Sequence, residues 1–95
     1  MSRELWRRGG TELAAMVADG AISAREVIDA HLDRIDEVNG WLNAVVRVDA
    51  EGARAAADTV DRARAAGEAL GPLAGVPFTV KDGLDLAGHP TTYGI

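Results

Sequence analysis

Two short β-favoured runs on either side of one long helical segment are the feature that most constrains this fold. The first run, residues 43–48, contains Val45, Val46 and Val48, and the second, residues 76–81, reads Val-Pro-Phe-Thr-Val-Lys. Valine-rich runs bounded by turn residues are typical of strands. A strand, a helix and a strand in succession predict a βαβ unit with parallel strands and a right-handed crossover. Because two strands alone make no stable sheet, further strands must come from elsewhere.

The helical segments are marked by capping residues at their starts and by glycines at their ends. The expected helices span about 11–19, 24–39 and 50–66, and their expected stops are Gly20, Gly40 and Gly67. Ser23 and Glu26 fit a capping box, in which a hydroxyl and a carboxylate satisfy free backbone donors at a helix start. These helices and the βαβ unit together predict an α/β fold for residues 1–95.

Length and charge narrow the classes of function that remain. At 95 residues the chain is at most one small domain, and its net charge of −5 argues against nucleic acid or an anionic membrane as a partner. The absence of cysteine excludes disulfides, thiolate metal sites and cysteine nucleophiles within residues 1–95. No run is apolar enough to span a membrane, and residues 1–10 do not read as a secretory signal. We therefore expect a cytoplasmic enzyme, and the abrupt end at Ile95 suggests the first part of a longer chain.

Lys81, the only lysine in the chain, is the candidate catalytic residue. It ends the second β-favoured run, and ligands bind at the carboxyl ends of strands in open α/β sheets. Arginine stays protonated, whereas a desolvated lysine can lose its proton and accept one from a serine hydroxyl. An ordinary surface lysine, or one paired with Asp82, is the alternative interpretation.

Other residues give weaker signals. The loop Gly83–Gly94 could line a polar pocket or simply connect two elements. His31 and His89 are the only histidines and form no usual metal site without help from carboxylates. The sequence contains neither a phosphate-binding loop nor a dinucleotide fingerprint, so we expect no cofactor and no metal.

One stretch resembles the catalytic-lysine region of the amidase signature family. It reads Gly71-Pro72-Leu73-Ala74-Gly75-Val76-Pro77-Phe78-Thr79-Val80-Lys81-Asp82 and is followed by Ala87-Gly88-His89-Pro90-Thr91-Thr92-Tyr93-Gly94. The resemblance covers nearly all 95 residues. It implies that residues 1–95 are the N-terminal fragment of a single amidase domain, with a mixed sheet flanked by helices.

The resemblance also implies a chemistry. Members of this family hydrolyse carboxylic amides to an acid and ammonia or an amine, with a nucleophilic serine, a bridging serine in a cis peptide bond and a lysine. Lys81 matches the lysine, and both serines would belong to a Gly/Ser-rich stretch beyond Ile95. Many members have Asn where this chain has Gly83, which puts nearby hydrogen bonds in doubt.

Several alternatives stay open at this point. The protein could be a stand-alone amidase acting on a small-molecule amide, or the amidase-type A subunit of the glutamyl/aspartyl-tRNA amidotransferase. It could also be a non-catalytic truncated product. The 95-residue chain alone is expected to be inactive, because the resemblance places the nucleophile outside it. The N-terminal helices could pack on the rest of the protein or on a second copy in a homodimer.

Overall fold

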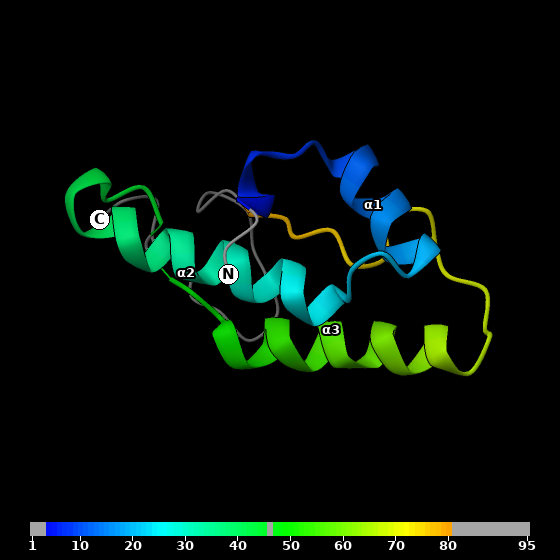
Figure 1. Ribbon diagram of the computed structural model, residues 1–95. Coiled ribbons are helices and arrows are strands. Elements are labelled where there is room, and N and C mark those ends of the chain that lie inside the picture. Colours follow the sequence, from blue (N-terminus) through cyan, green and yellow to red (C-terminus); the bar gives the residue numbers. More distant parts are fainter. Residues whose placement is uncertain (1–3, 46, 81–95) are drawn as a thin grey trace.

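The computed structural model describes residues 4–45 and 47–80, and this part of the chain is helical (Figure 1). Its elements are the 3-10 helix η1 (Leu5–Arg7) and the α-helices α1 (Gly10–Asp19), α2 (Ala24–Leu42) and α3 (Ala50–Ala65). The helical segments expected from the sequence are confirmed as helices, whereas η1 was not expected. Its single turn packs the side chain of Leu5 into the core.

The start of α2 is fixed by four hydrogen bonds to its first backbone donors and its cap. The expected capping box is confirmed, since Glu26 N–H donates to Ser23 Oγ at 3.0 Å and Ser23 N–H donates to Glu26 Oε1 at 3.1 Å. The two backbone N–H groups between Ser23 and Glu26 donate to a side chain of another helix. Ala24 N–H and Arg25 N–H donate to the two carboxylate oxygens of Asp61 in α3, at 2.7 and 3.1 Å. The start of α2 is therefore joined directly to α3.

The expected stop of α2 at Gly40 is wrong, because the helix continues to Leu42. A glycine permits a helix end but does not require one. Asn43 ends the helix instead, with a left-handed backbone at φ 55° and its N–H donating to Asn39 O at 2.7 Å. The Asn39 side chain then holds the chain that leaves the helix, through bonds of 2.8 and 2.9 Å to the backbone of Val45.

The helices α2 and α3 lie side by side and antiparallel, with α1 on the other side of α2 (Figure 1). Their shared core is small. Its buried members are Leu5, Leu13, Val17, Ile22, Ala24, Val27 and Ala57. Because two of these seven are alanines and two are valines, the buried side chains supply modest apolar area, as expected for a chain of this length.

The expected βαβ unit does not form within the described residues. Residues 43–45, 47–48 and 76–80 lie in no helix or strand. A strand needs a neighbouring strand to satisfy its backbone groups, and the helical part of this chain offers none. Apolar side chains that a sheet would bury are exposed instead, with Phe78 at 83% and Val48 at 45%. The α/β class remains a prediction.

Candidate functional site

The chain reaches Lys81 through two consecutive turns that lie against the helices. Ala74 N–H donates to Gly71 O at 3.2 Å, and Val76 N–H donates to Leu73 O at 3.1 Å. After the second turn the side chain of Val76 packs against the core. It also approaches the start of α1, where a methyl group built on Gly10 would lie 3.5 Å from Val76 Cγ1. The segment is thus anchored five residues before Lys81.

Gly75 lies at the tightest point of this anchor. Its φ of 86° is in the left-handed region that favours glycine. A Cβ there would lie 3.0 Å from both methyl groups of Val17 and 3.3 Å from Ala24 Cβ. Val17 and Ala24 are completely buried, so neither has free space to move into. The backbone of Gly75 therefore rests directly on α1 and on the start of α2.

The predicted site residue, Lys81, lies outside the described residues, as do the loop Gly83–Gly94 and His89. Of the two serines in the chain, Ser23 is occupied as the cap of α2, in agreement with its interpretation from the sequence, and Ser2 is also outside the described part. The structure therefore places the approach to the candidate base but not the base.

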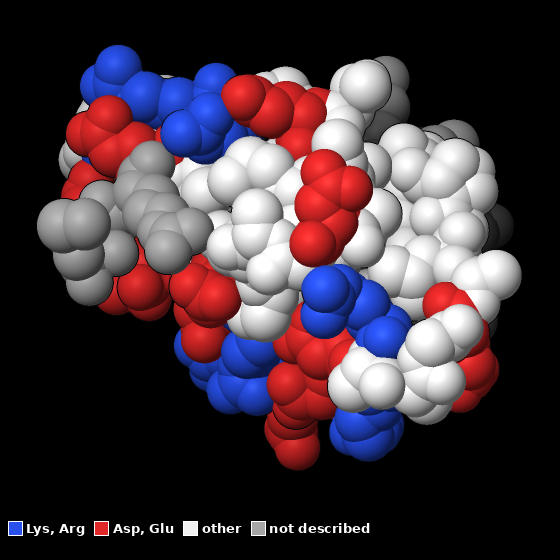
Figure 2. All heavy atoms as spheres, turned by 45° about the vertical axis from the view of Figure 1, so that its right-hand side comes forward, with Lys and Arg blue, Asp and Glu red and all other residues white. Residues whose placement is uncertain are grey.

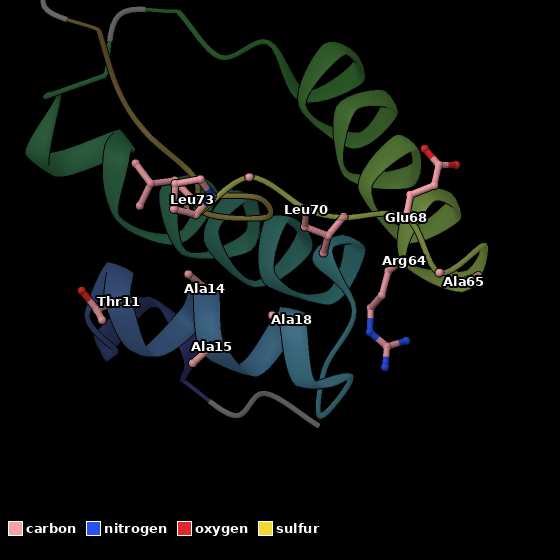
Figure 3. A pocket seen from close by; sticks show the side chains of 12 residues that line it. Thr11, Ala14, Ala15, Ala18, Arg64, Ala65, Glu68, Leu70 and Leu73 are labelled. Atoms are coloured by element: carbon pink, nitrogen blue, oxygen red, sulfur yellow. The ribbon is translucent and has the colours of Figure 1, made fainter.

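An open hollow of about 870 Å³ borders the same turn. Its residues come from α1, from the end of α3 and from the connection that follows, and they are Thr11, Ala14, Ala15, Ala18, Arg64, Ala65, Gly67, Glu68, Leu70, Gly71, Pro72 and Leu73. Figure 3 shows the small side chains of Ala14, Ala15 and Ala18 along α1, with Leu70 and Leu73 on the connection and Arg64 at one end. Sequence reasoning missed this hollow, because its walls are brought together only by the packing of distant segments.

Charged side chains join α2 to α3 along their interface. Arg25 pairs with Asp29 at 3.2 Å and with Asp58 at 3.0 Å, and Arg54 pairs with Asp29 at 2.9 Å. The hydrogen bond from Arg54, together with the charge of Arg25, holds the pKa of Asp29 below its ordinary value. The hydrogen bond to Asp58 likewise raises the pKa of Arg25. All these side chains are half-exposed, and each forms an ion pair with a side chain of opposite charge. The cluster therefore joins the two helices and is not a candidate catalytic site.

Neither a metal site nor a membrane span is found within residues 4–45 and 47–80. No group of three or more His, Asp or Glu side chains converges there as a metal would require, and His31 instead lies 2.7 Å from Val27 O through its Nδ1. None of the described helices is both long and apolar enough to cross a bilayer. Acidic and basic side chains are interleaved on the face drawn in Figure 2, which is not a basic surface.

A model of the amidase family matches residues 26–95, which is most of the chain. The chain belongs to the amidase family. This confirms the family expected from the string that ends in Lys81-Asp82. The matched residues include nearly all of α2, the whole of α3, the anchored turn and Lys81.

The named relatives of this amidase-family chain fall into two groups. The A subunit of glutamyl-tRNA(Gln) amidotransferase from Salinispora arenicola is 55% identical over 91 residues, and its namesake in Acidothermus cellulolyticus is 54% identical over 91 residues. An acylamidase of Rhodococcus erythropolis is 46% identical over 85 residues. These matches cover 96%, 96% and 90% of the chain, which spans only 18% of the length of each relative. No solved structure matches the chain.

The names of these relatives bear on the expected partners. The first group is named for a tRNA and for one component of a larger enzyme, and the second for an amide-cleaving enzyme. The expectation that this chain has no nucleic-acid partner rested on its net charge of −5, and these names leave that expectation unconfirmed.

Proposed function

We propose that this chain is part of an amidase-family enzyme that hydrolyses a carboxylic amide to an acid and ammonia or an amine, with Lys81 as its proton-accepting base. The observation that carries the proposal is the family match over residues 26–95, which includes the only lysine of the chain, in the string that resembles the family's catalytic-lysine region. Lys81 is preceded by an anchored turn, and a base must be held in place to act.

The proposed chemistry divides amide cleavage into two steps. The neutral amine of Lys81 accepts a proton from a bridging serine, which in turn takes the proton of a nucleophilic serine. The nucleophile attacks the amide carbonyl, the C–N bond breaks, and the leaving nitrogen takes up a proton and departs. Water then hydrolyses the acyl-serine ester and restores the enzyme. Both serines belong to the part of the protein beyond residue 95, which the much greater length of the relatives supports.

The proposal is tested with Lys81→Arg in the full-length protein, with hydrolysis of a simple aryl amide as the measurement. Arginine keeps the positive charge but cannot give up its proton, so we expect kcat to fall at least about a hundredfold. Circular dichroism checks that the variant keeps the wild-type fold. Unchanged turnover in folded Lys81→Arg would remove Lys81 from the mechanism.

A second candidate is favoured by the 55% identity to an amidotransferase component, which exceeds the 46% identity to the acylamidase. In this alternative the same chemistry releases ammonia from glutamine for use by a partner protein. We expect such a component to cleave glutamine in preference to an aryl amide, and only in the presence of its partner. A purified full-length protein that cleaves the aryl amide alone, and faster than glutamine, would instead indicate a stand-alone amidase.

A further inference from the structure

We propose that Gly75 is a positioning residue for Lys81, and that its direct contact with Val17 sets the path of the chain toward the base. This inference rests on the proposed function, because it assigns a role in catalysis that acts through Lys81. It concerns a residue that neither touches the substrate nor takes part in proton transfer.

The contact at Gly75 leaves no room for a side chain. The left-handed φ of 86° already disfavours any other residue, and a Cβ would lie 3.0 Å from both Val17 methyl groups. Val17 is fully buried between the helices and cannot swing aside without opening the core. A substitution at Gly75 must therefore move the turn and Val17 apart by a few tenths of an ångström.

The anchor at Gly75 and Val76 is the last fixed point before Lys81 among the described residues. Val76 N–H is the last backbone donor with a bond to another described residue, and Pro77 has no N–H to offer. The side chains of Phe78, Thr79 and Val80 are exposed and add little contact of their own. The direction in which residues 77–80 leave Val76 is therefore set at the turn.

Gly67 provides a matched control for backbone strain. It has a similar left-handed φ of 76°, but a Cβ built on it meets no atom within 4 Å. Gly67→Ala thus carries the same kind of conformational penalty as Gly75→Ala without moving the turn. If Gly75 served only to permit a left-handed backbone, the two substitutions would have the same effect on catalysis.

The experiment measures kcat and KM for a simple aryl amide in the full-length enzyme, at a temperature where each variant is folded by circular dichroism. A misplacement of about 1 Å can cost on the order of a hundredfold in rate. The shift that Gly75→Ala requires is a few tenths of an ångström, so we expect a smaller fall in kcat, of about tenfold, with KM unchanged, because the change acts on the base and not on substrate binding. Gly67→Ala is expected to keep the wild-type kcat.

Val17 offers a rescue and a second route to the same test. Val17→Ala removes the methyl groups that the new Cβ would strike, so the double variant Gly75→Ala/Val17→Ala is expected to recover most of kcat. Should Gly75→Ala fail to fold, Val17→Ile serves instead, because its larger side chain crowds the backbone of Gly75. We expect Val17→Ile to lower kcat with KM unchanged.

The inference and the proposed function can fail separately. A folded Gly75→Ala enzyme with wild-type kcat, an equal loss in Gly67→Ala, or unchanged kcat in Val17→Ile would overturn the role of Gly75. Full activity of Lys81→Arg would overturn the proposed function itself.

Discussion

Asp29 shows how one residue in this chain ties two helices together by charge. Its carboxylate accepts hydrogen bonds from Arg25 on its own helix and from Arg54 on α3. The contact with Arg25 follows from sequence spacing alone, because Arg25 lies four residues earlier on the same helix face. The contact with Arg54 was not predictable, because it depends on how α2 and α3 pack. Lys81 and Gly75 differ in the same way, since a lone lysine is visible in the sequence and a contact between residues 17 and 75 is not.

The lowered pKa of Asp29 predicts a component of acid sensitivity. Since the folded state holds the carboxylate in its charged form, the stabilisation is fully present above the ordinary carboxyl pKa and is lost as pH falls through the lower folded value. We expect the melting temperature of the 95-residue chain to exceed that of Asp29→Asn at pH 7, and the difference to shrink toward pH 3. Asp33→Asn, an exposed position one turn along α2, is the control and is expected to show little difference at either pH. A difference in melting temperature between wild type and Asp29→Asn that is the same at pH 7 and at pH 3 would contradict this prediction.

At the scale of elements, the local rules predicted where α2 begins better than where it ends. The capping box of Ser23 and Glu26 is local, so four residues of sequence were enough to find it. The end at Leu42 depends on Asn43 and on the bonds between Asn39 and Val45, which compete with the more obvious signal of Gly40. The role of Asp61 is beyond any local rule, because it lies 37 and 36 residues from the two donors that it satisfies.

Asp61 is therefore expected to stabilise α2 although it belongs to α3. Loss of the carboxylate removes the acceptor of two backbone donors at the start of α2, Ala24 N–H and Arg25 N–H. We expect Asp61→Ala to lower the free energy of unfolding by about 1–3 kcal/mol, measured by urea denaturation of the chain. Asp61→Asn keeps one acceptor and should lose less. If Asp61→Ala were as stable as the wild type, the cap would contribute nothing.

At the scale of the whole molecule, the described residues leave large apolar side chains uncovered. The most exposed are Phe78 at 83%, Trp41 at 74% and Leu73 at 68%. Trp41 lies just before the first run that the sequence predicts as a strand, and Phe78 lies within the second. The valine pattern records a preference for a sheet, but a sheet also needs partner strands, and this chain spans 18% of the length of its relatives. The sequence therefore indicates an element whose hydrogen-bonding partners are not found among residues 4–45 and 47–80.

This argument predicts that Trp41 changes its surroundings between the 95-residue chain and the full-length protein. In a Trp6→Phe background Trp41 is the only tryptophan of the chain, so its fluorescence in that chain reports one site. We expect water-like emission and strong acrylamide quenching for the chain, where Trp41 is 74% exposed. In the full-length protein, with any other tryptophan replaced by phenylalanine, we expect a blue-shifted emission and weaker quenching, because neighbouring segments cover apolar surface of this size. Equal quenching in both proteins would mean that this end of α2 stays open to water, which would contradict the prediction.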